Sequence, residues 1–122
     1  MNRRVLRGIE LRYALTHNLD VHGRASIYEM LELLGCQGFA VVGNPSKAVS
    51  DALRWEVRRG RVRRLRRGVY GPGTMPRSTE YHIHQRVLAL FDEVARLRGF
   101  DDADHYEDAD HYEDAFWDSL PA

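Results

Sequence analysis

The side chains best suited to chemistry in this chain are its arginines and a single lysine, which are densest between Lys47 and Arg67. That segment holds nine bases and two acids. Arginine carries a planar guanidinium that stays charged and can hold a phosphate group through two parallel hydrogen bonds. The chemistry that the segment predicts is therefore recognition of a polyanion, with no bond made or broken.

Motifs for catalysis or metal binding do not appear in the sequence. There is no glycine loop for a nucleotide phosphate, no nucleophile elbow and no zinc-protease helix, and Gly71-Pro72-Gly73 is a chain breaker. His82 and His84 diverge on a helix, so they make a poor metal pair, and the lone Cys36 has no disulfide partner. We therefore expect no catalytic residue, no metal ligand and no cofactor.

The formal net charge of zero is the sum of two opposed blocks. All 18 Lys and Arg lie between Arg3 and Arg98 together with nine Asp and Glu, so this block has a net charge of +9. Residues 100–122 carry the other nine acids and no base, a net charge of −9. The basic block favours a polyanionic partner, and an acidic end of matching charge is able to compete with that partner.

The length of 122 residues, 43 % of them hydrophobic, is typical of a single globular domain. We expect a domain over residues 1–76, a C-terminal helix over 77–99 and an acidic tail over 100–122. No apolar run approaches the roughly 20 residues of a membrane span, and none follows the basic start as in a secretory signal. With a single cysteine, these features predict a cytoplasmic protein without a membrane partner.

The elements that must position the basic side chains begin with two helices. Spacing predicts the first helix over Val5–Asn18, followed by a turn over Asn18–Gly23 and a short strand at Arg24–Ala25. Ser26 and Glu29 fit a capping box, so the second helix begins there and ends at Gly35. Residues 39–42 fit either a short buried strand or an apolar loop.

The third helix begins at Asn44 or Ser46, with Pro45 in its first turn, and ends before Gly60. Val49, Ala52 and Leu53 share its apolar face. Its opposite face carries Lys47, Ser50, Asp51, Arg54 and Arg58. Glu56 falls on the apolar side, where it would pair with an arginine or lie at the edge of the core.

A basic hairpin follows this helix directly. Arg61–Leu65 alternates apolar and basic side chains, Arg66–Gly68 forms a tight turn with Gly68 free to take positive φ, and Val69–Tyr70 returns. We expect residues 71–76 to break all regular structure. The hairpin side chains expected on its outer face and at its tip are Arg61, Arg63, Arg64, Arg66 and Arg67.

Two runs, Pro45–Leu53 and Gly60–Tyr70, resemble a winged helix-turn-helix DNA-binding domain. The second run is similar to the wing of bacterial regulators and of the N-terminal domain of abortive-infection antitoxins. The resemblance covers about Ile9 to Tyr70. It implies a mainly α fold with a small β-hairpin, to which this chain adds a C-terminal helix.

The resemblance implies that the third helix lies in the major groove of double-stranded DNA. Lys47, Ser50, Asp51 and Arg54 would read bases, Arg58 would contact phosphate, and the hairpin arginines would contact the backbone or the minor groove. It implies sequence-specific DNA binding by a nucleoid-associated transcriptional regulator. Two alternatives are an architectural, nucleoid-type protein that binds DNA with little sequence preference, and a protein-interaction module such as an antitoxin.

A fourth helix is predicted from Ser78 to about Gly99. Five of its apolar residues follow a heptad spacing: Ile83, Val87, Leu90, Val94 and Leu97. This seam packs back on the domain and completes its core, or forms a two-fold homodimer, or does both because the apolar face is wide; we favour the dimer.

The acidic tail contains the repeat Ala103–Asp108 and Ala109–Asp114, and its composition predicts disorder. Three interpretations remain open. The tail is an inert solubilising end, or it covers the basic face and weakens DNA binding, or Phe116, Trp117 and Leu120 dock on a protein partner.

Overall fold

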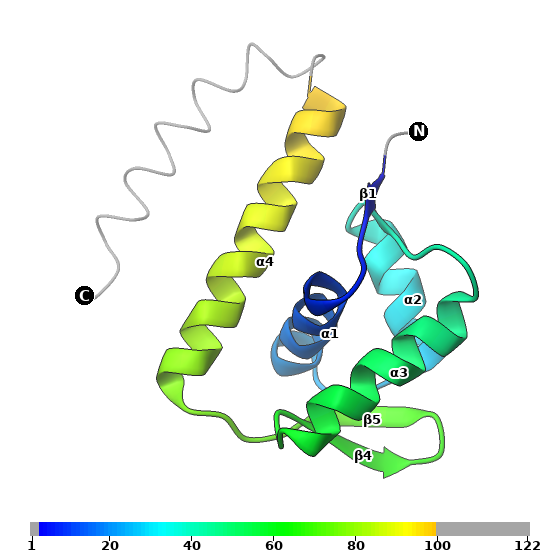
Figure 1. The fold of residues 1–122 in the computed structure, drawn as a ribbon, viewed down its shortest axis with the longest axis vertical. Coiled ribbons are helices and arrows are strands. Elements are labelled where there is room, and N and C mark those ends of the chain that lie inside the picture. Colours follow the sequence, from blue (N-terminus) through cyan, green and yellow to red (C-terminus); the bar gives the residue numbers. More distant parts are fainter. Residues whose placement is uncertain (1–2, 100–122) are drawn as a thin grey trace.

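The computed structural model describes residues 3–99, so every expectation for the acidic tail lies outside the described residues. The described part is mainly helical, with four helices and two small sheets (Figure 1). The helices are α1 (Ile9–His22), α2 (Ile27–Cys36), α3 (Pro45–Arg58) and α4 (Arg77–Arg98). The strands are β1 (Arg4–Val5), β2 (Ala25–Ser26), β3 (Phe39–Ala40), β4 (Val62–Arg66) and β5 (Val69–Pro72).

The first helix lies four residues later than its predicted bounds, so the expected helix at Val5 and the expected turn at Asn18 are both wrong. Gly8 has φ +60°, which prevents the helix from beginning earlier. Arg4 and Val5 instead pair in parallel with Phe39 and Ala40. Asn18 is buried inside α1, where its amide exchanges two hydrogen bonds with the amide of Gln37 at 3.0 and 2.9 Å. Because Asn18 is polar but buried, it interrupts the apolar spacing from which the extent of the first helix was predicted.

The capping box at the start of α2 is confirmed. The Ser26 hydroxyl accepts a hydrogen bond from the Glu29 backbone N–H, and the Glu29 carboxylate accepts one from the Ser26 backbone N–H. The short strand before α2 is present but lies at Ala25–Ser26, one residue later than predicted. The apolar stretch after α2 contains a two-residue strand, β3, so the strand is the correct one of the two alternatives.

The hairpin belongs to a three-stranded antiparallel sheet in the order β2-β5-β4. Gly68 closes the hairpin with φ +74°, as predicted. The pairing shifts between Arg64 and Arg66, which leaves Leu65 opposite no single partner and 41 % exposed. The expected break at residue 71 is wrong, because β5 continues to Pro72 opposite Val62.

The hydrophobic core gathers around α1, which contacts α2, α3, α4 and the sheet. Ile83, Val87, Leu90 and Val94 of α4 are each at most 5 % exposed within a single chain. These four residues therefore complete the chain's own core, which is the alternative to the dimer seam. The prediction that they form a dimer interface is corrected, because buried side chains are not available to a second copy. Leu97 lies beyond this group and is 41 % exposed.

Candidate nucleic-acid interface

The start of α3 is fixed by local hydrogen bonding. The Asn44 side chain accepts a hydrogen bond from the backbone N–H of Lys47 at 3.2 Å, and Pro45 occupies the first helical position. Val49 and Leu53 are fully buried, so the helix is rotated with its predicted outer face toward solvent. The core contacts of α3 thus decide which of its polar side chains a partner can reach.

Three of the predicted base-reading residues contact one another on this outer face. Lys47 Nζ lies 2.9 Å from Asp51 Oδ2, and Arg54 Nη1 lies 3.6 Å from Asp51 Oδ1. The hydrogen bond from Lys47 lowers the pKa of Asp51 below its ordinary value. Ser50 is half-buried beside them. Asp51 therefore holds two cations in place on the exposed side of the helix, each of which remains more than 60 % exposed.

Glu56, the exception in the sequence pattern, is fully buried on the inner side of α3. Its Oε1 accepts hydrogen bonds from Arg61 Nε at 2.7 Å and from the Thr16 hydroxyl at 2.8 Å. Its Oε2 accepts hydrogen bonds from Arg61 Nη2 at 2.8 Å and from Arg12 Nε at 3.1 Å. Burial by itself raises the pKa of Glu56, but the hydrogen bonds from Arg61, Thr16 and Arg12 outweigh it, so the pKa lies below its ordinary value.

The predicted role of Arg61 as a DNA contact is corrected by this network. Its side chain is 13 % exposed, and both Nε and Nη2 donate to Glu56. The Arg61 backbone also donates to the Glu56 carbonyl at 3.1 Å, directly before β4 begins. Arg61 therefore fastens the base of the hairpin to the end of α3, and it is not available to a phosphate group.

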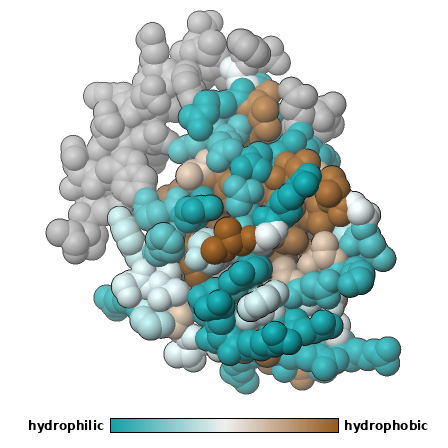
Figure 2. Space-filling view, in the orientation of Figure 1, coloured by the Kyte–Doolittle hydropathy of each residue, from teal (hydrophilic) through white to brown (hydrophobic). Residues whose placement is uncertain are grey.

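The other hairpin arginines point to solvent. Within residues 3–99, the side chains of Arg63, Arg64, Arg66 and Arg67 are exposed and form no ion pair or hydrogen bond. The hairpin lies beside α3 at the base of the molecule (Figure 1). Figure 2 shows predominantly hydrophilic surface over this region. Since cations without partners repel one another, the hairpin is a surface that favours an anionic ligand.

Trp55 is a part of this surface that the sequence pattern did not identify. Its side chain is 48 % exposed at the flank of α3. The guanidinium carbons of Arg12 and Arg58 lie 5.4 and 5.6 Å from its ring centroid, within cation–π range. Two further exposed bases, Arg24 and Arg59, lie next to the sheet and to the end of α3 and were also missed. Helical spacing places Trp55 only one position away from the apolar face, so its exposure needed the tertiary structure.

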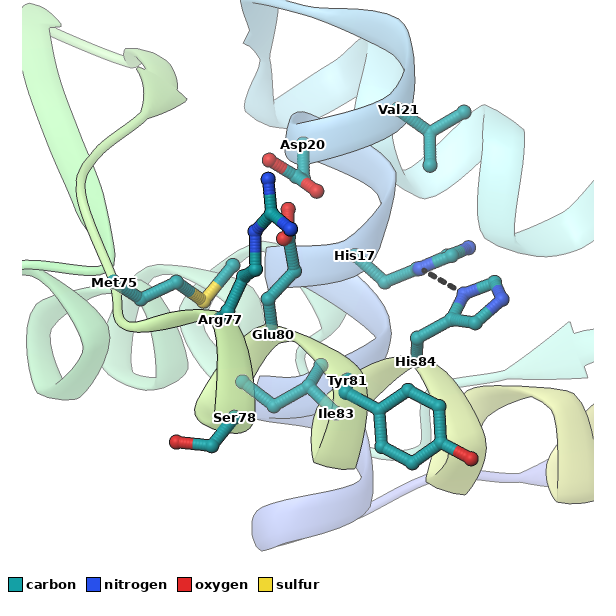
Figure 3. Close-up of a pocket in the computed structure, with 10 residues that line it drawn as sticks. All are labelled: His17, Asp20, Val21, Met75, Arg77, Ser78, Glu80, Tyr81, Ile83 and His84. Atoms are coloured by element: carbon teal, nitrogen blue, oxygen red, sulfur yellow. Dashed lines mark hydrogen bonds between the residues drawn. The ribbon is translucent and has the colours of Figure 1, made fainter. Parts of the chain in front are cut away.

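A pocket lies near the end of α1, separate from the basic surface of α3 and the hairpin. No sequence pattern indicated it. It has a volume of about 860 Å³ and is bordered by α1, the linker after the hairpin and the start of α4 (Figure 3). Val21, Met75 and Ile83 supply its apolar wall. The walls come from three separate parts of the chain, so no single sequence motif could indicate it.

The polar wall of this pocket includes the ionisable side chains of His17, Asp20, Arg77, Glu80 and His84. His17 Nδ1 and His84 Nδ1 lie 3.5 Å apart, and Figure 3 shows Asp20 and Glu80 close together on the two helices. Burial, followed by the charge of His84, lowers the pKa of His17. A hydrogen bond with Asp20, together with its charge, raises the pKa of Glu80. Burial in this pocket thus favours the neutral form of His17, and the neighbouring Asp20 favours the protonated form of Glu80.

Neither a metal cluster nor a membrane-spanning helix occurs in the described part of the chain. Between residues 3 and 99, no three His, Cys, Asp or Glu side chains are arranged to hold a metal ion. In the same range, no helix combines the length and the apolar character that crossing a membrane requires.

Comparison of the chain with protein-family models, curated proteins and solved structures finds no match.

Proposed function

We propose that the chain binds double-stranded DNA in a sequence-specific manner, as a transcriptional regulator of the winged-helix type. The observation that carries this proposal is the exposed basic surface shared by α3 and the adjacent hairpin. The bases on it are Lys47, Arg54, Arg58, Arg59, Arg63, Arg64, Arg66 and Arg67, against the single acid Asp51. A surface of this charge and extent is typical of phosphate-backbone binding.

The order of the elements supports the winged-helix interpretation. The helices α1, α2 and α3 precede the hairpin, and the strand β2 between α1 and α2 pairs with β5 of the hairpin. The Glu56–Arg61 ion pair joins α3 to the hairpin, so the two basic parts hold a fixed relation. A helix and a hairpin held in this way are able to contact a major groove and the neighbouring backbone together.

The roles of the proposed contacts differ in kind. Arg54, which is 64 % exposed on the outer face of α3, would donate two hydrogen bonds to guanine O6 and N7. Asp51 orients Arg54 and Lys47 and is itself able to accept a hydrogen bond from cytosine. The hairpin arginines would contact phosphates, which supplies affinity but little sequence preference. DNA binding of this kind does not require the homodimer that the heptad spacing predicted.

Duplex binding by the full chain, followed by fluorescence anisotropy across a salt series, tests this proposal. Selected duplexes should bind at least about 10³-fold more tightly than random ones. Arg54→Ala should reduce that preference, and Arg66→Ala/Arg67→Ala should lower the salt slope by about 0.9 for each phosphate that is no longer neutralised. Arg86→Ala, an exposed arginine of α4, is the matched control and should change neither.

Two outcomes would replace the proposal with one of its alternatives. Equal affinity for all duplexes with a steep salt slope would indicate an architectural, nucleoid-type protein. No duplex binding at low salt would show that α3 and the hairpin are not a DNA surface, and would favour a protein-interaction module such as an antitoxin.

A further inference from the structure

A hydrophobic groove lies beside the proposed DNA surface and is formed by three separate segments. It has a volume of about 350 Å³ and runs between the segment from Leu6 into the start of α1, the residues after β3 and one flank of α3. Leu6, Val41 and Ala48 lie in it, and Trp55 borders it. In the view of Figure 2, hydrophobic surface lies between the N-terminal segment and α3, above the hydrophilic surface of the hairpin.

Two apolar side chains at the border of this groove are exposed to water, which is unfavourable for apolar surface. Val42 is 53 % exposed and Trp55 is 48 % exposed, and both border the groove. The exposed Arg7 and the partly buried Arg12 lie at its edge, while Asp51 on the opposite edge is already paired with Lys47. The groove thus offers apolar contact area next to positive charge, which suits an apolar segment flanked by acids.

The chain itself contains a segment with this chemistry. The sequence Asp114-Ala115-Phe116-Trp117-Asp118-Ser119-Leu120 places two large apolar side chains between acids and a third, Leu120, just after them. The rest of residues 100–122 carries the other seven acids and no base, which brings the whole range to a net charge of −9. No residue of this segment is used by the proposed DNA contact.

The end of α4, from which the chain continues to this segment, lies near the groove. Glu93 pairs with Arg4 of β1 at 2.7 Å, and a side chain at Gly38 would collide with Val94 and Arg98. From Gly38 the chain passes through β3 and reaches the groove at Val41, three residues later, a span of at most about 11 Å. Phe116 lies 17 residues beyond Gly99. A chain of that length reaches up to about 60 Å, which is ample for the remaining distance.

We infer that the segment Phe116–Leu120 of the same chain docks in this groove and thereby weakens DNA binding. Phe116 and Trp117 fill the apolar groove next to Trp55, and the flanking Asp114 and Asp118 face Arg7 and Arg58. The acidic repeat that precedes the segment then lies over the outer face of α3, where it excludes phosphate by like-charge repulsion. The docking itself requires only the groove, while its effect on DNA rests on the proposed function.

Covalent attachment explains why the chain's own segment is the favoured occupant. A tethered segment is present at an effective concentration in the millimolar range, so even a weak contact is populated. If that concentration exceeds the dissociation constant about fivefold, about one molecule in six is open, and the apparent Kd for DNA rises about sixfold.

Paramagnetic relaxation in the full chain tests the docking. Cys36, the single cysteine, is exposed, so Cys36→Ser with Ser119→Cys gives one site for a nitroxide label. We expect amide signals to broaden at Val42, Ala48 and the Trp55 indole, with no such broadening when labelled and isotope-labelled chains are merely mixed. Phe116→Ala/Trp117→Ala, which keeps all nine acids of the tail, should abolish the broadening. Val42→Asp, at an exposed position, should do the same.

Three results would overturn this inference. Broadening that follows the hairpin and survives Phe116→Ala/Trp117→Ala would show attraction by charge alone. Broadening that arises mainly between different molecules would make the occupant a second copy. Absence of any local broadening would show that the groove does not hold the tail.

Duplex DNA binding separates the failure of docking from the failure of the proposed function. If the chain binds DNA, Phe116→Ala/Trp117→Ala should tighten binding about three- to tenfold at fixed salt. Docking with unchanged DNA affinity would refute the regulatory effect alone. Docking without any DNA binding would refute the proposed function and leave the docking intact, because the relaxation data do not involve DNA.

Discussion

Replacement of Glu56 by glutamine should destabilise the fold strongly, although it changes only one atom of the side chain. The carboxylate is fully buried and accepts four hydrogen bonds, three of them from the guanidinium groups of Arg12 and Arg61. The amide of glutamine keeps one acceptor and turns a donor toward a guanidinium. Two charge-assisted hydrogen bonds of about 1.5 kcal/mol each are lost, so the free energy of unfolding should fall by about 3 kcal/mol.

Urea unfolding, followed by circular dichroism, measures this change. For a folded part of this size, a loss of about 3 kcal/mol corresponds to a fall in Tm of roughly 12–24 °C. The matched control is Asp51→Asn, which removes a carboxylate that is also paired with two cations but is exposed on the outer face. We expect it to leave the unfolding midpoint almost unchanged, because exposed ion pairs contribute little.

The pH dependence of stability gives an independent check on the same residue. Because the folded-state pKa of Glu56 lies below its ordinary value, its contribution is present above the unfolded-state pKa of about 4.5 and is lost as the pH falls below it. Glu56→Gln should therefore flatten the acid limb of the stability profile. A loss of less than about 1 kcal/mol for Glu56→Gln, with an unchanged acid limb, would show that the buried network is not a net stabiliser.

The remaining predictions concern the hairpin, the linker and the histidine pair. Arg66→Ala/Arg67→Ala should weaken duplex binding by about tenfold or more at low salt, measured by anisotropy, with little change in Tm. Gly73→Ala should destabilise the fold by about 1–3 kcal/mol in urea unfolding, since a Cβ there would meet the backbone of Gly60, Arg61 and Val62. Stability should also fall as the pH drops from about 7 toward 5, because burial and then His84 lower the pKa of His17. The unfolded chain then binds the proton more readily, and His17→Gln should reduce this slope.

Each of these expectations has a control that isolates its cause. Arg86→Ala removes one exposed base from α4 and should leave duplex binding unchanged. Ala at Gly99, where the backbone has φ −88° and a Cβ meets open space, should be tolerated, so equal losses at Gly73 and Gly99 would contradict the steric explanation. A His17→Gln profile parallel to that of the unchanged chain would exclude His17 as the titrating group.

Local signals in the sequence predicted much of the secondary structure correctly. The capping box at Ser26, the Asn44–Pro45 start of α3, the turn at Gly68 and the extent of α4 all depend on residues within a few positions of one another. Such features are set by backbone conformation and short-range hydrogen bonds, which a sequence displays directly. The outer face of α3 was predictable for the same reason, since helical spacing alone separates it from Val49 and Leu53.

The predictions that were wrong concern features set by contacts between residues far apart in the sequence. Arg4 and Val5, predicted to lie at or before the start of the first helix, instead pair in parallel with β3. No local sequence pattern indicates a strand partner 35 residues away. The heptad in α4 was real, but its spacing is the same whether it faces a second copy or α1. Only packing showed that Ile83 and Val87 lie inside one chain.

The sequence by itself determined the charge of the molecule, its helical segments and the concentration of arginine around α3 and the hairpin. The tertiary structure decided which of those arginines a partner can reach. Arg61 and Arg64 are chemically identical and three positions apart, yet Arg61 donates to a buried carboxylate and Arg64 faces solvent. The physical reason is that a buried charge is stable only when it is paired, and the buried Glu56 carboxylate is paired with Arg12 and Arg61.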